Sequence, residues 1–387
     1  MEMFVYKKSS LLDIVVLVFI NSYILAQATD NKSALLFSVC SILFAAIFPF
    51  IIYKKCKVVN KSSIITIFCV AFYIVLFIMA NDNLPKERLV FYGILSLSSL
   101  ILAYHAGREF FNIQKVINIQ LGLVFFLLLS FKVYAILNTM PLYAAVSIWL
   151  KGFSYNYISA HIIILLALKI VIDTLKNERV GFRVLLISSI AFYFCVELYG
   201  RSGIFFSFLI LVAVAINFMR DRGLVVVIFS SFLLVVFIVI LWLNVDIIID
   251  LLNETKFKEG VDSPRSLMLD EYFSNFDLYS FVFGKNLHDT VLIKSFNFNP
   301  HNSYLNGHVA FGVIGVIFNV VILCMILAVS IKRSALIIFM IMVILGRAFF
   351  DVLIFPGIFD FIIYGIFFLI FNKRSFQSTA LLPEKRC

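Results

Sequence analysis

Two segments of the sequence combine side chains that could do chemistry. The first, NPHNSYLNGHVAFGVIG at 299–315, places His301 directly before a long apolar stretch, with Asn302 and Tyr304 beside it. The dipole of a following helix disfavours protonation of an imidazole at its start, so this histidine could act as a base near neutral pH. Asn302 could orient the imidazole. An interfacial histidine without a catalytic role is the alternative interpretation.

The second segment, ELYGRSGIFF at 197–206, places Arg201 between two apolar runs. A guanidinium group beside a helix N-terminus is suited to bind an anion. The small residues Gly200 and Gly203 would let a ligand approach the backbone. A snorkelling arginine, or an ion pair with Glu197 four residues earlier, explains the same pattern without a ligand.

Other ionisable residues are weaker candidates. Arg265, in SPRSLM, could bind phosphate, although an arginine in a loop is often only solvated. Arg347 and Asp351 are four residues apart, which favours a structural ion pair. No P-loop, dinucleotide-binding, metal-binding or nucleophile-elbow motif occurs in the sequence, so we expect no metal and no cofactor. Three further histidines are also weaker candidates: His161, His288 and His308.

The elements that must position these residues are membrane helices. The chain is 63% hydrophobic and 14% charged, with a mean hydropathy of +1.05, which excludes an ordinary soluble globular protein. About 20 apolar residues cross a bilayer as a helix, and on that basis roughly twelve spans are expected. We therefore predict an all-α, polytopic membrane helix bundle that forms one domain, 1–387. The expected spans are 11–27, 34–53, 64–80, 89–105, 116–138, 156–173, 181–199, 202–219, 223–244, 304–330, 334–348 and 358–372.

One connection is much longer than the others. The segment 245–303 mixes charged residues with many aromatic residues and has no spanning hydrophobicity. A loop of this length is usually functional or disordered, and the aromatic content favours a folded structure. Polar, aromatic surfaces of this kind suit sugars as well as membrane interfaces.

The distribution of basic residues predicts the orientation of the spans. Twenty of the 32 Lys and Arg residues fall on one set of connections and 11 on the other, five of these in the long loop; Lys132 lies within a span. Both termini are thus predicted to be cytoplasmic, and 245–303, Arg201 and His301 to face outward. The net charge of +10 follows mostly from this bias and requires no nucleic acid partner.

The order of three motifs resembles a known family. GRSG opens a mid-chain span, FVFGKNLH follows Arg265 in the long loop, and PHNSYL leads into GHVAFGVIG. This pattern is similar to that of the O-antigen polymerase and O-antigen ligase superfamily, over 197–315 in motifs and over the whole chain in topology. GRSG departs from the commoner Ser-Arg pair because glycine precedes the arginine.

The resemblance implies a metal-independent glycosyltransferase of the bacterial inner membrane. Such enzymes act at the periplasmic face on glycans carried by undecaprenyl pyrophosphate. By matching position, His301 would be the catalytic histidine, and Arg201 and Arg265 would bind the pyrophosphate, with Asn302 and Tyr304 in support. The expected reaction is direct glycosyl transfer with inversion at the anomeric carbon and without a covalent enzyme intermediate.

Within this family a polymerase is favoured, because the chain is very rich in phenylalanine (45 residues). Undecaprenyl-pyrophosphate-linked oligosaccharide would then be donor and acceptor, membrane lipid a second partner, and a chain-length regulator protein a further candidate partner. An O-antigen ligase, which transfers the glycan to the lipid A core, is the alternative. A flippase for the same lipid-linked unit is a second alternative, disfavoured because charged residues concentrate at span ends.

Overall fold

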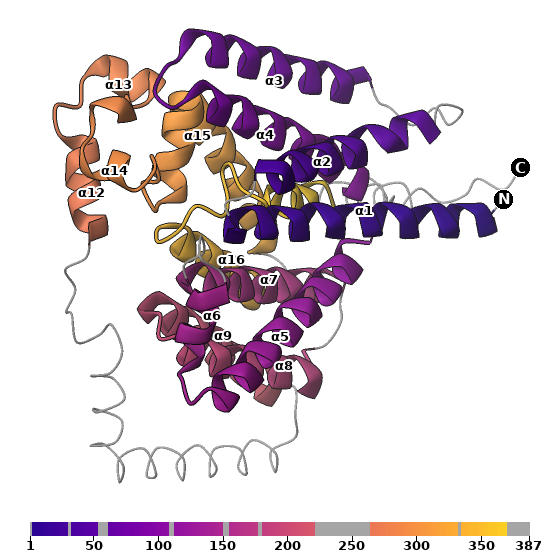
Figure 1. The fold of residues 1–387 in the computed structure, drawn as a ribbon. Coiled ribbons are helices and arrows are strands. Elements are labelled where there is room, and N and C mark those ends of the chain that lie inside the picture. The colour runs from indigo at the N-terminus through magenta and orange to yellow at the C-terminus, as the bar shows by residue number, and fades with distance from the viewer. Residues whose placement is uncertain are drawn as a thin grey trace, which may run out of the picture. The chain divides into compact units, whose positions relative to one another are not determined.

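The computed structural model describes residues 2–29, 32–52, 61–107, 112–149, 155–176, 180–220, 264–331 and 334–369. Within these ranges the chain is helical and contains no strand, so the predicted all-α class is confirmed for them (Figure 1). The predicted span at 223–244 and the first part of the predicted loop, 245–263, lie outside the described residues.

Five helices in the described ranges are long and apolar enough to cross a membrane, which supports the membrane class. They are α4 (Lys86–Gly107), α5 (Ile113–Leu137), α7 (Tyr155–Leu175), α9 (Arg201–Arg220) and α15 (Ser303–Ser330). Shorter apolar segments lie in α1 (Glu2–Thr29), α2 (Lys32–Ile52), α3 (Lys61–Ala80), α16 (Ala335–Ala348) and the helical residues 360–369. The total of about twelve spans stays a prediction.

Contacts divide the chain into two compact units. Unit 1 comprises 1–120, 267–333 and 348–387, and unit 2 comprises 121–266 and 334–347. In unit 1, α2 packs against α1 and α4, and α3 packs against α4. In unit 2, α7 packs against α6 (Leu142–Trp149), α8 (Phe182–Glu197) and α9. That residues 1–387 form a single domain stays a prediction.

The described part of the predicted long loop is folded into short helices. After α12 (Pro264–Phe273) come α13 (Leu278–Phe283), the 3-10 helix η2 (Leu287–Asp289) and α14 (Leu292–Ser295). We call residues 267–302, all in unit 1, the helical loop. It adjoins the first half of α15, against which α13 packs (Figure 1).

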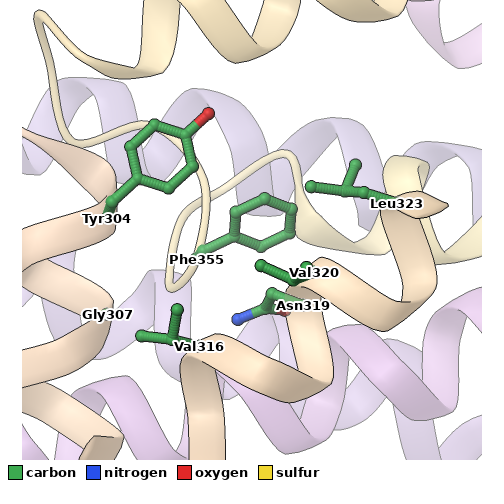
Figure 2. A pocket seen from close by; sticks show the side chains of 7 residues that line it. All are labelled: Tyr304, Gly307, Val316, Asn319, Val320, Leu323 and Phe355. Carbon is green, nitrogen blue, oxygen red and sulfur yellow. The ribbon is translucent and has the colours of Figure 1, made fainter. Parts of the chain in front are cut away.

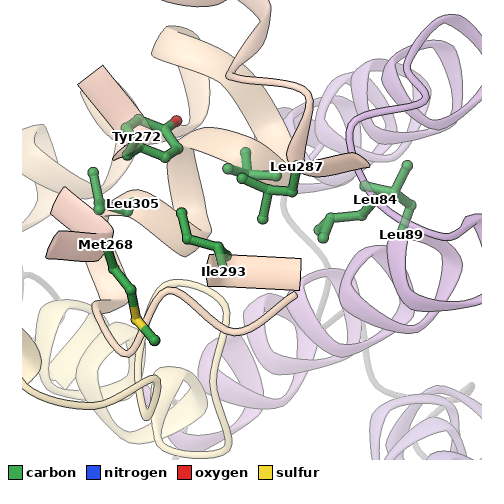
Figure 3. Packing of buried hydrophobic residues seen from close by; sticks show 8 residues of the cluster. Leu84, Leu89, Met268, Tyr272, Leu287, Ile293 and Leu305 are labelled. Atoms are coloured by element: carbon green, nitrogen blue, oxygen red, sulfur yellow. The ribbon is translucent and has the colours of Figure 1, made fainter. Parts of the chain in front are cut away.

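A cluster of buried side chains holds the helical loop to α4 and α15 (Figure 3). Burying a large aliphatic side chain contributes about 1.5–3 kcal/mol, so this cluster is sufficient to fix the short helices in place. Its members are Leu84, Leu89, Met268, Tyr272, Leu287, Ile293, Leu305 and Val309.

Side-chain carboxylates accept hydrogen bonds from the backbone N–H groups at the starts of two of the short helices. Glu271, in α12, accepts hydrogen bonds from the backbone N–H groups of Val291 (2.6 Å), Leu292 (2.9 Å) and Ile293 (2.9 Å), where α14 starts. Desolvation raises the pKa of Glu271, but these three hydrogen bonds outweigh it and hold the pKa below its usual value. Asp277 accepts from the backbone N–H of Ser280 at 2.7 Å, at the start of α13.

Helix α15 is broken at Gly312, whose φ of 61° and ψ of −169° are not helical. Glycine tolerates this conformation, and a Cβ here would collide with the carbonyl oxygen of Val282. The carbonyl group of Phe311, beside the break, accepts a hydrogen bond from the Tyr73 hydroxyl at 2.6 Å. The break is therefore stabilised by its surroundings, because a side chain of a neighbouring helix forms a hydrogen bond with a backbone carbonyl group beside it.

Candidate functional site

The turn that precedes α15 is held by polar contacts. Asn302 is the residue before the helix, and its side-chain oxygen accepts hydrogen bonds from the N–H groups of Tyr304 (2.9 Å) and Leu305 (3.2 Å). This is the usual reason for asparagine at a helix start. His301 has a positive φ of 49°, and its N–H donates to the side-chain oxygen of Asn299 at 2.9 Å. The structure thus shows Asn302 shaping the turn that presents His301.

The imidazole of His301 lies beside a carboxylate. Its Nδ1 is 4.0 Å from Oδ1 of Asp351, with 26% of the histidine side chain and 6% of the aspartate side chain exposed. This separation exceeds a hydrogen bond, so the contact is electrostatic. The ring of Phe296 packs edge-on against the imidazole, with centroids 5.6 Å apart. A partly exposed imidazole between a carboxylate and an aromatic ring can accept a proton from a bound hydroxyl.

A serine fixes the position of Asp351. The hydroxyl of Ser303 donates to the carbonyl oxygen of Asp351 at 2.7 Å and accepts from the N–H groups of Leu353 (3.2 Å) and Ile354 (3.4 Å). The first residue of α15 therefore anchors the segment that carries the carboxylate. The sequence did not predict Asp351 as a residue of this site, because its four-residue spacing from Arg347 favours a structural ion pair.

Tyr304 is the second residue of α15 and borders a small pocket. Its ring packs on that of Phe349, with centroids 4.6 Å apart. The pocket lies between the two halves of α15 and Phe355 (Figure 2). Its lining is almost entirely apolar; the side-chain oxygen of Asn319 in its wall accepts a hydrogen bond from Tyr364 at 2.7 Å. Tyr304 therefore places a phenol ring beside an apolar recess.

Arg201 belongs to unit 2, where it is the first residue of α9 and is half-buried. The small residues around it fit against the start of α7. A Cβ at Gly203 would lie 2.8 Å from Oγ of Ser159, and one at Gly200 would collide with the side chain of Asn156. These glycines are thus required for helix packing, and the expectation that they admit a ligand stays a prediction.

Glu197 has a partner other than the one the spacing suggested. Its Oε2 is 2.7 Å from Nζ of Lys132, on α5. Lys132 was expected to lie within a span, and this ion pair explains how its charge is accommodated there. The guanidinium of Arg347, which is fully buried, donates to the carbonyl oxygen of Asn156 at 2.9 Å. Arg347 therefore contacts the first turn of α7, close to Gly200.

Arg265 is the second residue of α12 and is half-buried. A cation in the first turn of a helix meets the positive end of the helix dipole, and a bound anion would offset this repulsion. Arg265 and Arg201 are in unit 2, whereas His301, Asn302 and Tyr304 are in unit 1.

His308, in α15, has a structural role. Its Nε2 is 2.8 Å from the carbonyl oxygen of Phe281, which can only accept, so Nε2 carries the proton. Nδ1 then accepts from the hydroxyl of Tyr272 at 2.7 Å. Burial raises the pKa of Tyr272 well above its usual value, which keeps this hydroxyl protonated as the donor. These contacts attach the helical loop to α15.

A charged pair that was not predicted from the sequence is buried within α7. Nζ of Lys169 is 2.7 Å from Oδ2 of Asp173, and only 8% and 5% of the two side chains are exposed. Almost every other side chain of this helix is also buried. The four-residue spacing allows the pair, but burial could not be read from the sequence.

Among the described residues, no group of three or more His, Cys, Asp or Glu side chains is arranged to hold a metal ion. Comparison of the chain with protein-family models, curated proteins and solved structures finds no significant match.

Proposed function

We propose that this chain is a glycosyltransferase of the bacterial inner membrane that joins oligosaccharide repeat units carried on undecaprenyl pyrophosphate, at the periplasmic face. One observation carries the proposal: the imidazole of His301 lies beside the carboxylate of Asp351, directly before the start of α15, a helix long enough to cross a membrane. A nearby carboxylate favours the imidazolium ion that a histidine becomes when it acts as a general base. The PHNSYL motif that contains this histidine is the part of the sequence that most resembles O-antigen polymerases.

In the proposed reaction His301 removes the proton of the acceptor hydroxyl. The hydroxyl oxygen forms a bond to the anomeric carbon of the donor sugar, while the bond from that carbon to the pyrophosphate oxygen breaks. The pyrophosphate leaves with the bonding electrons, and the anomeric configuration inverts. Asp351 stabilises the imidazolium ion that forms.

The arginines are assigned to the diphosphate. Arg201 combines a guanidinium with the N-terminus of a 20-residue helix, and Arg265 lies in the first turn of α12. Both features favour negative charge, so each could stabilise the charge that develops on the leaving pyrophosphate. Asn302 supports the site by holding the turn, and Tyr304 by bordering the recess beside it.

A second candidate function is translocation of the same lipid-linked unit. The observation that favours it is the buried Lys169–Asp173 pair, because ionisable residues inside membrane helices often belong to transport pathways. The pair lies in the last two turns of α7, so it does not extend a charged path along the whole helix.

Reconstitution separates these functions. Purified protein in lipid vesicles, supplied with lipid-linked repeat units and without any ion gradient, is expected to produce a ladder of longer glycans on a gel. Movement of the lipid-linked units across the vesicle bilayer without elongation would instead support the flippase and refute the enzyme.

A deletion strain identifies the acceptor. Loss of a polymerase leaves the lipopolysaccharide core capped with a single repeat unit, whereas loss of a ligase leaves bare core and polymer on the carrier lipid. We expect the first phenotype, and the second would assign the chain to the ligases.

A further inference from the structure

The helical loop contains a polar cavity that the proposed chemical step does not use. Its volume is about 490 Å³, within the range of small-ligand sites. It is lined by the end of α12, by α13 and by the chain that leads to α14, and most lining side chains are polar. The cavity lies entirely within unit 1.

The walls of the cavity are held by internal contacts. Glu271 is bound to the start of α14, Asp277 to the start of α13, and the ammonium of Lys285 to the carbonyl oxygen of Ser274. Gly284 has a φ of 89°, and a Cβ there would lie 2.9 Å from Cα of Val309 in α15. The cavity is therefore preformed, which lowers the entropic cost of binding.

Several polar groups at the cavity are not used in the fold. Within the described residues, the carboxylate of Asp289, the side-chain amide of Asn275 and the hydroxyl of Tyr279 have no hydrogen-bond or ion-pair partner. Tyr279 also exposes its ring, one side of which contacts Phe283. The cavity thus offers free donors, free acceptors and an aromatic surface.

The charge of the lining limits the ligands that fit. Glu271, Asp277 and Asp289 contribute three negative charges and Lys285 one positive charge, a net charge of −2. Hydrogen bonds to backbone N–H groups hold the pKa of Glu271 and that of Asp277 below their usual values, so both are ionised at neutral pH. Phosphate groups and carboxylated ligands are therefore repelled.

We propose that this cavity binds an uncharged or amino-bearing saccharide unit and thereby selects the repeat unit that the enzyme accepts. Sugar hydroxyls donate and accept hydrogen bonds at once, which matches the mixture of carboxylate, amide and phenol groups. The C–H face of a sugar ring packs against an exposed aromatic ring such as that of Tyr279. The selective role rests on the proposed function, whereas the binding does not.

Saturation-transfer NMR on the full chain in lipid nanodiscs tests the inference. The probes are the methyl glycosides of N-acetylglucosamine, galactose and glucosamine, compared with that of glucuronic acid. We expect binding of at least one of the first three, and roughly tenfold weaker or no binding of the glucuronide.

Substitutions locate the binding. The double variant Asp289→Ala with Asn275→Gly removes two free groups, and glycine keeps the positive φ of 50° at position 275. It should reduce saccharide binding roughly tenfold or more. Asp270→Ala, which removes an equally exposed charge from α12 outside the cavity, should bind as the unchanged protein does.

The inference is overturned if none of the probes binds, if the glucuronide binds as well as the others, or if the double variant keeps full binding. A His301→Asn variant separates this result from the proposed function, because it should lose elongation and keep saccharide binding. Protein that elongates glycans without binding any probe would refute the inference alone. Protein that binds the probes but never elongates would refute the proposed function alone.

Discussion

The starts of α15 and α9 carry the two principal candidate residues, yet they are built differently. Before α15, the turn is held by side-chain hydrogen bonds from Asn302 and Ser303, and His301 faces a carboxylate. Before α9, the chain is held by steric fit, since Gly200 and Gly203 receive the side chains of Asn156 and Ser159. One start presents its candidate side chain beside a polar partner, and the other brings two helices together.

A short polar turn between apolar runs can therefore have either of two roles: it can allow two helices to pack closely, or it can hold a side chain beside a polar partner. Small residues around a candidate arginine are accounted for by packing, so they add nothing to the case for a ligand at Arg201. Asp351, by contrast, is held beside the imidazole by the hydrogen bond between its carbonyl oxygen and the Ser303 hydroxyl. The proposed function therefore rests more on the start of α15 than on the start of α9.

The largest effect is expected from His301→Asn. Asparagine tolerates a positive φ, so the turn should persist while the base is lost. Elongation by the reconstituted protein should fall about 10²- to 10⁴-fold. His288→Ala, an exposed histidine of the helical loop, serves as the control and should keep its rate. Retained activity in His301→Asn would refute the proposed role of the α15 start.

A smaller loss is expected from Asp351→Asn, which removes the charge beside His301. Because the pair is separated by more than a hydrogen bond, kcat should fall about 10- to 100-fold, less than for loss of the histidine. KM should be unchanged, since Asp351 is not assigned to substrate binding. A general loss of structure would also lower the apparent kcat at constant KM, but that loss would persist in a His301→Asn background. In the double variant with His301→Asn the two losses should not add.

Arg201→Lys tests whether the start of α9 binds an anion in addition to packing against α7. Lysine keeps the charge but cannot bind a phosphate through two parallel hydrogen bonds, so elongation should fall about tenfold. Arg220→Lys, at the exposed end of the same helix, is the matched control. An unchanged rate in Arg201→Lys would show that a snorkelling cation is sufficient and would leave packing as the whole explanation of this turn.

Gly203→Val tests the steric side of the comparison. Its Cβ would lie 2.8 Å from Oγ and 2.9 Å from Cβ of Ser159, and overpacking of this kind costs about 1–3 kcal/mol. The apparent melting temperature in detergent should therefore fall. Gly122→Val in α5, where a Cβ would meet nothing within 4 Å, should melt close to the unchanged protein. Equal melting of the two variants would contradict the fit between α9 and α7.

The smallest effect is expected at a third helix start, that of α14. The pKa of Glu271 is lowered in the folded state, so its carboxylate stabilises the fold at neutral pH, and this stabilisation is lost as the pH falls through the lowered pKa. Glu271→Gln should remove it at neutral pH too. Hydrogen exchange, corrected for intrinsic pH dependence, should show faster exchange at Val291, Leu292 and Ile293. Unchanged protection there would show that α14 needs no carboxylate.

Local sequence patterns predicted the helices and their starts well. Apolar runs of spanning length identified the five long helices, because hydropathy over about 20 residues depends only on the chain itself. The predicted span 304–330 matches α15 to within one residue at its start, because the apolar run begins where the polar turn ends.

Partners distant in the sequence could not be predicted. Asp351 reaches His301 only through the fold, and its four-residue spacing from Arg347 favoured a local interpretation. Glu197 likewise pairs with Lys132 on another helix rather than with Arg201. Each of these contacts depends on how helices pack, which a single sequence records only as separate polar residues. The role of Asn302 as a helix cap was available from residue type, but its position beside a histidine drew attention to chemistry instead.

The break at Gly312 has a consequence for the depth of the protein in its membrane. The large exposed apolar side chains of α15 all follow the break: Ile314, Ile317, Val320, Val321 and Met325. The segment 313–330 alone gives about 27 Å of helix, close to the thickness of the hydrocarbon layer. The nine residues before the break are thus not needed for crossing and can form a ledge at headgroup level. Under the proposed function, such a ledge would let the diphosphate headgroup of a carrier lipid approach His301 without leaving the level of the headgroups.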